Sequence, residues 1–340
     1  MTEIEKQYFA QLSDSRSKDA DVLDRPNLRG VKKSIVDKYS DQAHFVYELI
    51  QNADDVGATE SSFDVYEDKL VFSHNGKRSF RVTNPATEEK DSNNHCLGDI
   101  NAITAIGLSS KLDSNKKGNA IGKFGMGFKA VFQYTNTPEI YDSNAAFRIE
   151  RQIVPILLDH DYPGRKLGET VFVFPFNNAE AKRPALDSLE KLKSLLFPTL
   201  FLKNLEVITF NYGPDIGEYR KQVVETIPLG HDGEATICER IEHSKTIQSD
   251  IEKREILLFS RTDKENHRYS VGIVLDDGGS PLSADYKAFC FFPTKHGTNL
   301  KFLIHAPFLL TDGRETIKEF EDYNKDMVEK LSDLFCDCVI

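Results

Sequence analysis

The sequence lacks several features that would assign it to a specialised class of protein. No apolar run approaches the roughly 18 residues that cross a membrane, so a membrane protein is not expected. The N-terminal stretch MTEIEKQYFAQLSDSRSKD is charged and has no apolar centre, which argues against a secretory signal. Positive charge is scarce, because 43 Lys and Arg oppose 54 Asp and Glu for a net charge of −11. That balance disfavours nucleic-acid binding over the whole surface but leaves a local basic patch open.

Cysteine is also scarce. The five cysteines are an odd number, are widely scattered, and show no disulfide framework or paired metal-ligand spacing. Cys336 and Cys338 could form a redox or metal pair, or could be two thiols near a helix end. This usage predicts a reducing, cytoplasmic compartment.

The 340 residues suggest two domains, and 39% hydrophobic with 29% charged residues is typical of a globular protein. The chain ends on a predicted helix with no cap or tail, which leaves open that it is the N-terminal piece of a longer protein. Residues 84–98 and 109–120 are predicted loops. Hydrophobic periodicity predicts helices near 41–53, 99–106, 124–134, 185–196 and 319–340. Residues 1–25 are predicted to be helical or partly loose. Strands are predicted within 63–73 and at 147–154, 170–176, 205–212, 255–261, 269–275, 286–292 and 301–306.

The stretch HFVYELIQNADD, residues 44–55, carries polar groups where a buried helix would be apolar. A helix places Glu48 and Asn52 on one face, one turn apart, with Asp55 three residues further on. The amide oxygen of Asn52 suits a hard cation such as Mg²⁺, which takes oxygen ligands and keeps several waters. A carboxylate such as Glu48 can orient or deprotonate a water that attacks phosphorus.

The stretch IGKFGMGFKAVF, residues 121–132, has three glycines in the spacing GxxGxG. Glycine lets backbone amides approach a ligand closely and point at phosphate oxygens. In a dinucleotide-binding protein such glycines follow the first strand, whereas here they follow a polar loop and an acidic helix. Taken singly, the acidic helix could be a solvated face and the glycines a tight turn. Their order and their separation of about 70 residues favour a shared role.

Three further stretches accompany these two: IGLSSK at 106–111, PEIYDS at 138–143 and FRIER at 147–151. The helix stretch ELIQNADD and the glycine stretch IGKFGMGFKAVF resemble the ATP-binding domain of the GHKL superfamily, which includes gyrase, the ninety-kilodalton heat-shock chaperone, histidine kinases and MutL. Together with the three further stretches, QNADD and IGKFGMGFKAVF are more closely similar to its sacsin-type branch, and this resemblance runs from about residue 28 to 325.

The resemblance implies an α+β fold. We expect a Bergerat-type two-layer α/β sandwich, with a mixed, mostly antiparallel sheet and helices on one face, followed by a second, transducer-like α/β domain. The implied divisions are an N-terminal segment at 1–27, the ATP-binding domain at 28–200 and the middle domain at 201–340.

The resemblance also implies roles for individual residues. Glu48 is the expected general base, Asn52 the magnesium ligand and Asp55 a nearby pocket residue. Thr170, in the late Gly-x-Thr motif at 168–170, is expected to bond near the adenine. The expected phosphate-binding motif and lid contribute Lys111, Gly122, Lys123, Phe124, Gly125, Met126, Gly127 and Phe128.

One position departs from the superfamily's pattern. Its second motif has an aspartate before x-Gly that receives the adenine amino group, but here the stretch is Ser73-His74-Asn75-Gly76. A neutral His74 or the Asn75 side chain can accept a hydrogen bond, yet neither fully replaces a buried carboxylate. Base selectivity is therefore open, and His74 could equally be an exposed turn histidine.

The stretch APFLLTDGRETI, residues 306–317, presents Arg314. A lone arginine is usually solvated, but this stretch resembles the chaperone's middle-domain segment in which an arginine reaches the γ-phosphate. The forked guanidinium suits a phosphate, so Arg314 is the candidate γ-phosphate sensor. Lys295 is a second candidate.

The expected function is Mg²⁺-dependent binding and slow hydrolysis of ATP that drives a conformational clamp. The chain would be the ATPase module of a chaperone-like, antiviral-defence or DNA-processing protein. Expected partners are ATP, a protein client or effector domain, and a second copy in an ATP-dependent homodimer, but not a membrane or directly bound nucleic acid. The alternative is a non-catalytic, nucleotide-gated interaction domain.

Overall fold

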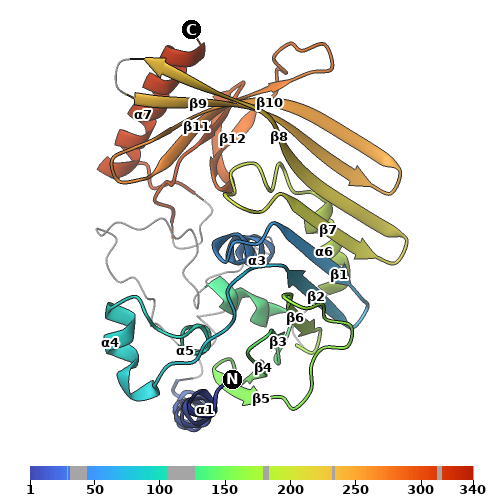
Figure 1. The fold of residues 1–340 in the computed structure, drawn as a ribbon, viewed down its shortest axis with the longest axis vertical. Helices are drawn as coiled ribbons and strands as arrows, with labels where there is room; N and C mark the ends of the chain where they lie inside the picture. Colours follow the sequence, from blue (N-terminus) through green and yellow to red (C-terminus); the bar gives the residue numbers. More distant parts are fainter. Residues whose placement is uncertain are drawn as a thin grey trace. The chain divides into compact units, whose positions relative to one another are not determined.

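The computed structural model describes residues 1–28, 30, 44–105, 127–178, 184–231, 234–311 and 316–339 (Figure 1). The chain divides into two compact units. Unit 1 comprises Met1–Lys116, Ala120–Ser194 and Ile208–Ile216, and unit 2 comprises Lys117–Asn119, Leu195–Val207 and Gly217–Ile340. The fold class is mixed α+β with mostly antiparallel strand pairing, which confirms the coarser form of the fold prediction.

Unit 1 is built on a sheet with the strand order β7-β1-β2-β6-β3-β4-β5. The pairs β1–β2, β2–β6, β6–β3, β3–β4 and β4–β5 are antiparallel. The strands are β1 (Glu60–Val65), β2 (Lys69–His74), β3 (Glu139–Tyr141), β4 (Ala146–Glu150), β5 (Val154–Leu157), β6 (Thr170–Pro175) and β7 (Val207–Tyr212).

The N-terminal helix α1 (Glu3–Leu23) packs on strand β5. Its first turn is closed by a capping box, in which Thr2 and Glu5 satisfy each other's backbone amides. The remaining helices of unit 1 are α3 (His44–Asp55), η1 (Pro85–Thr87), α4 (Glu88–Asn93), α5 (Asp99–Thr104), η2 (Gly127–Gln133) and α6 (Pro184–Lys193).

An aromatic row crosses the centre of this sheet. Phe63, Phe72 and Phe172 are directly opposite one another on β1, β2 and β6, with ring centroids 4.6 and 5.8 Å apart. Phe128 of η2 covers the row, with its ring 6.1 Å from that of Phe172. Each buried ring stabilises the unit by roughly 1.5–3 kcal/mol, so this row fixes both the sheet register and the place of η2.

Unit 2 has the strand order β8-β9-β10-β11-β14-β12-β13. The paired strands of this sheet run antiparallel, except that β12 is parallel to β14. Helix α7 (Asp322–Val339) packs on β10 and β11 and buries Met327, Leu331 and Leu334 against Val271. The strands are β8 (Asp215–His231), β9 (Glu234–Ile247), β10 (Asp250–Thr262), β11 (Arg268–Leu275), β12 (Tyr286–Cys290), β13 (Phe292–Leu300) and β14 (Leu303–His305).

The structure corrects several predicted elements. The predicted loop 84–98 contains η1 and α4. The predicted strand 147–154 is two strands, because Arg151 and Gln152 have positive φ values of 53° and 71° and turn the chain. The predicted strand 286–292 breaks at Phe291, where φ is 63°. The described part of the predicted helix 124–134 is the 3₁₀ helix η2.

Within the described ranges, no helix is both long and apolar enough to cross a bilayer.

Two histidines of unit 2, His243 and His305, are buried. His305 is 1% exposed and its ring stacks on Phe201 at 4.5 Å. In the described part of the chain, neither of its ring nitrogens has a hydrogen-bond partner. Burial is the main cause that lowers the pKa of His305 and of His243 to about 3. Both rings are therefore neutral in the folded protein at neutral pH.

We expect the free energy of unfolding to fall as the pH decreases from 7 to 5. In the unfolded chain a histidine has a pKa of about 6.5, so between that value and about pH 3 the unfolded state binds more protons than the folded state. Each histidine then contributes a slope of up to about 1.4 kcal/mol per pH unit. Urea midpoints followed by circular dichroism at several pH values measure the slope. His305→Phe keeps the stacking ring but removes one titrating group, so it should reduce the slope by up to about 1.4 kcal/mol per pH unit. An unchanged slope would contradict this account.

Candidate functional site

Helix α3 places Glu48 and Asn52 inside unit 1. Glu48 is 4% exposed and Asn52 is 6% exposed. Leu49 and Phe45 on the same helix are buried as well, and the Phe45 ring lies 4.7 Å from that of Tyr134, just beyond η2. The alternative of a solvated helix face is therefore wrong for this acid and amide pair.

Asn52 Oδ1 is a buried acceptor that has no hydrogen-bond donor among the described residues. Leaving such an oxygen unsatisfied costs about 1–3 kcal/mol, and a cation or a ligand donor would remove that cost. Mg²⁺ prefers oxygen ligands and commonly binds one or two protein oxygens, completing its shell with phosphates and waters. Asn52 therefore fits a magnesium ligand chemically. In the ranges the structure describes, no group of three or more His, Cys, Asp or Glu side chains gathers to hold a metal.

The end of α3 is held against the segment that follows β2. The Lys77 backbone N–H donates to Val56 O at 3.0 Å. A Cβ atom on Gly76 would lie 2.4 Å from Val56 Cγ2, which is closer than atoms approach, so this position needs glycine. Asp55, at the last position of α3, attracts the Arg78 guanidinium. The acid and amide helix and the second predicted motif are thus joined directly.

Three polar side chains lie side by side at the end of the sheet. The register pairs Ser61 with His74 and His74 with Thr170, and directly opposite residues share a face of the sheet. They are 4%, 5% and 3% exposed, respectively. Ser61 Oγ has no hydrogen-bond partner within the described ranges. We call these three residues the polar row.

Thr170 reaches the polar row through a tight turn. Gly168 has φ of +80°, a conformation that favours glycine, and Glu169 N–H donates to Lys166 O at 3.1 Å. The turn delivers Thr170 as the first residue of β6. The structure therefore brings the predicted Gly-x-Thr motif beside the predicted second motif.

His74 is a buried residue of β2 and not an exposed turn histidine. Its ring centroid lies 5.9 Å from that of Phe72 and 5.8 Å from that of Phe172. The Gly76 backbone N–H donates to His74 Nδ1 at 3.1 Å. Burial lowers the pKa of His74 to about 4, so the imidazole is neutral at neutral pH.

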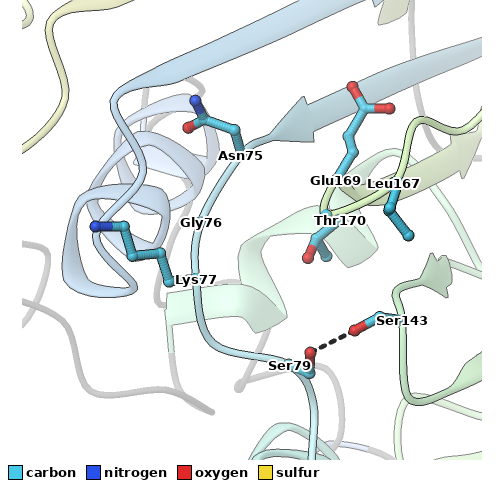
Figure 2. Close-up of a pocket in the computed structure, with 9 residues that line it drawn as sticks. Asn75, Gly76, Lys77, Ser79, Ser143, Leu167, Glu169 and Thr170 are labelled. Atoms are coloured by element: carbon cyan, nitrogen blue, oxygen red, sulfur yellow. Dashed lines mark hydrogen bonds between the residues drawn. The ribbon is translucent and has the colours of Figure 1, made fainter.

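Asn75 has a structural role in the fold. Its Oδ1 accepts from the backbone N–H groups of Thr59 and Glu60 at 2.9 and 3.0 Å, and its Nδ2 donates to Thr59 Oγ1 at 2.9 Å. Figure 2 shows Asn75 at the end of β2, with Thr170 on the neighbouring strand. The side-chain acceptor of Asn75 is therefore already used to join the ends of β1 and β2.

A cavity of about 470 Å³ opens beside these strand ends. On its rim, Ser79 Oγ and Ser143 Oγ are 2.6 Å apart (Figure 2). The described residues that line it include the predicted site residues Asn75, Gly76 and Thr170. Glu48, Asn52 and His74 do not line it, so the cavity reaches only one end of the predicted site.

The described end of the glycine stretch is anchored by a buried lysine. Gly127 begins η2, and Phe128 is 2% exposed in the core. Lys129, 3% exposed, donates from Nζ to Ile103 O and to Gln152 O, both at 2.7 Å. Burial and, less strongly, Arg16 lower the pKa of Lys129 to about 7. This lysine holds η2 against the end of α5 and the β4–β5 turn.

The remaining predicted site residues have no described placement beside α3. Lys295 is exposed on β13 of unit 2. Those that lie outside the described residues are Lys111, Gly122, Lys123, Phe124, Gly125, Met126 and Arg314.

Comparison with known families supports a sacsin-type relationship. Residues 26–150 match the family model described as the Sacsin domain. The matched segment contains α3, together with Ser61 and His74 of the polar row. The sacsin-type part of the sequence resemblance is thereby supported for this segment.

Two relatives cover different lengths of the chain. The chain is 28% identical over 330 residues to Protein NO VEIN of Arabidopsis thaliana, a match that covers 88% of this chain and 11% of that protein. It is 30% identical over 149 residues to Sacsin of Homo sapiens, covering 40% of this chain and 3% of that protein. The chain thus spans only a small part of the length of either relative.

Sequence reasoning assigned no role to Ser61 or Lys129. Ser61 could not be found from the sequence alone, because only the strand register places it beside His74. Lys129 could have been noticed in the sequence, because it is a charged residue inside the apolar run FKAVF. The structure shows that its ammonium group donates to two backbone carbonyls.

We expect Gly76→Ala to lower the free energy of unfolding by about 1–3 kcal/mol, because the added methyl group overlaps Val56 and crowds His74 Nδ1. Gly230→Ala is the matched control, since it adds the same methyl group at an exposed position with no atom within 4 Å. Chemical unfolding of both variants measures the difference. Equal stability of the two variants would show that the Gly76 contact does not constrain the site.

Proposed function

We propose that unit 1 binds a nucleoside triphosphate with Mg²⁺, and that the chain hydrolyses ATP slowly to drive a conformational switch, as in a GHKL-type ATPase. The observation that carries this proposal is the buried Oδ1 of Asn52, which has no hydrogen-bond donor among the described residues and lies one helical turn from the buried carboxylate of Glu48. A buried amide oxygen without a donor opposes folding, and a ligand that supplies its partner removes that cost.

Asn52 would hold the cation in this proposal. A single amide oxygen leaves most of the Mg²⁺ shell for phosphate oxygens and water, which is the usual arrangement in nucleotide sites. The bound ion would neutralise charge on the phosphates. Arg78, which is ion-paired with Asp99 and is also attracted by Asp55 at the end of α3, would help to keep the helix end in place while the ligand binds.

Glu48 would act on water. Its carboxylate lies one turn before Asn52 on a buried face, so a water beside a phosphate held near Asn52 would be within reach of Glu48. The carboxylate would orient that water and accept its proton as it attacks phosphorus. Hydrolysis is expected to be slow, because the reaction would wait for closure of the site.

The base would lie toward the polar row. Gly76 and Lys77 contact the residue that follows α3, and His74 and Thr170 lie at the adjacent strand ends. The cavity beside Gly76 and Thr170 opens at the same strand ends. The predicted lid at 109–120 and the predicted γ-phosphate sensor Arg314 belong to this proposal only through the sequence resemblance.

A second candidate is a nucleotide-gated interaction domain without catalysis. His74 favours it, because a buried neutral imidazole stands where the superfamily has a carboxylate. The buried Glu48 opposes it. Nucleotide binding without phosphate release by the unaltered protein would establish this alternative.

The wider role also remains a proposal. A chaperone-like module and a module of a defence or DNA-processing protein both fit an ATP-driven switch, as does an ATP-dependent homodimer. A protein client or effector and a cytoplasmic location are part of the same expectation.

We expect ATP to bind at least tenfold more tightly with Mg²⁺ than without it, and Asn52→Ala to remove this difference. The physical reason is loss of the metal's protein oxygen. Calorimetric titration with ATP, ADP and GTP, with and without Mg²⁺, measures the effect. Asn93→Ala, at an exposed position of α4, is the control and should behave as the unaltered protein. A Mg²⁺ effect that survives in Asn52→Ala would remove Asn52 as the ligand.

We expect Glu48→Ala and the isosteric Glu48→Gln to retain nucleotide binding and to reduce phosphate release at least a hundredfold, the order expected for loss of a general base. Glu67→Ala, in the exposed β1–β2 turn, is the matched control. Phosphate release is followed by a coupled assay at saturating ATP. Equal rates for the Glu48 variants and the control would exclude Glu48 as the base.

A further inference from the structure

The backbone N–H group of Gly76 determines which tautomer the neutral His74 ring adopts. The Gly76 N–H donates to His74 Nδ1 at 3.1 Å within the buried interior, and a ring nitrogen that accepts a hydrogen bond carries no proton. Burial keeps the ring neutral at neutral pH. A neutral imidazole has one proton, so that proton is on Nε2.

Among the described residues, the His74 ring makes one hydrogen bond, in which its Nδ1 accepts from Gly76. Its Nε2–H group therefore has no acceptor in this part of the chain. Its aromatic neighbours, Phe72 and Phe172, offer ring faces and no oxygen. On either side along the polar row stand the hydroxyl groups of Ser61 and Thr170. A hydroxyl can donate or accept, so it adapts to a ligand, whereas the fixed imidazole N–H can only donate.

Resting on the proposed triphosphate site, we infer that His74 Nε2–H donates to an acceptor on the edge of the bound base, so that the site takes 6-oxopurine nucleotides at least as tightly as adenine nucleotides. An aspartate in this position accepts only, and so it favours the 6-amino group of adenine. The histidine of this tautomer reverses that preference, because an amino group facing it would place two donors together. The 6-oxo group of guanine or hypoxanthine supplies the missing acceptor.

The hydroxyl groups of the polar row limit how strongly the site can prefer 6-oxopurine over adenine nucleotides. A site that pairs a buried donor with an acceptor discriminates strongly against a ligand that leaves the donor unmatched. Ser61 and Thr170 soften the effect, since either hydroxyl can turn to accept from an amino group. We therefore expect a preference of roughly tenfold and not complete exclusion of adenine.

The test is a competition titration of the full chain with Mg²⁺ and ATP, GTP or ITP. The unaltered protein should bind GTP and ITP at least as tightly as ATP, and His74→Asp should shift the ratio at least tenfold toward ATP. His74→Gln, which retains a side-chain N–H donor beside an acceptor, should accept all three nucleotides. ITP separates the 6-oxo group from the 2-amino group, because it lacks the latter.

Other results would overturn the inference. These are tighter binding of ATP than of GTP and ITP by the unaltered protein, an ATP-to-GTP ratio that His74→Asp leaves unchanged, and binding of GTP without ITP. If no triphosphate binds at all, the proposed function itself fails, which is a separate result. Should His74→Asp not fold, long-range ¹H–¹⁵N spectra of the unaltered protein decide the premise: the Nε2–H tautomer supports it, and the Nδ1–H tautomer contradicts it.

Discussion

The candidate site depends on the junction between the end of α3 and the end of β2. Gly76 fits against Val56 only because it has no side chain, and its N–H group also fixes the His74 ring. Lys77 adds a backbone hydrogen bond to Val56 at 3.0 Å. This one segment therefore sets the position of the acid and amide helix relative to the sheet, and at the same time decides which His74 nitrogen can donate.

The polar atoms around this junction are costly for a folded protein. Asn52 Oδ1 and Ser61 Oγ are buried without partners in the described ranges, and each such group opposes folding by about 1–3 kcal/mol. The aromatic row of Phe63, Phe72 and Phe172 lies two residues further along the same strands from Ser61, His74 and Thr170, and its burial offsets that cost. A stable aromatic row beside polar groups that have no partner in the described ranges is the arrangement expected of a ligand site, because the ligand restores the missing partners.

The sequence predicted the elements whose pattern is local. The apolar spacing around Glu48 and Asn52 identified α3, and the strands predicted within 63–73 correspond to β1 and β2. Strands β8 and β9 were not predicted, because charged residues are scattered along both and break the apolar pattern, and because β8 contains Pro228. Helix α4, with the sequence EEKDSN, has no apolar side chain that could have signalled a helix.

The site was only partly predictable for the same reason. Residue types and spacing were enough to select Glu48 and Asn52, and the family resemblance added His74 and Thr170, but their mutual placement depends on tertiary contacts. The pairing of His74 with Ser61 and Thr170 follows from strand register, and the engagement of Asn75 by the start of β1 follows from a backbone contact. Neither contact can be predicted from the neighbouring residues in the sequence, so only the structure shows that His74 is buried and which tautomer it adopts.

The most direct test of the central claim is a crystal structure of the chain with Mg²⁺ and a non-hydrolysable triphosphate. The account predicts a metal ion about 2.1 Å from Asn52 Oδ1, phosphates beside α3, and a base within hydrogen-bond distance of the polar row. A crystal soaked at saturating ligand in which α3 has no bound metal or phosphate, or in which the triphosphate lies elsewhere on the molecule, would contradict it.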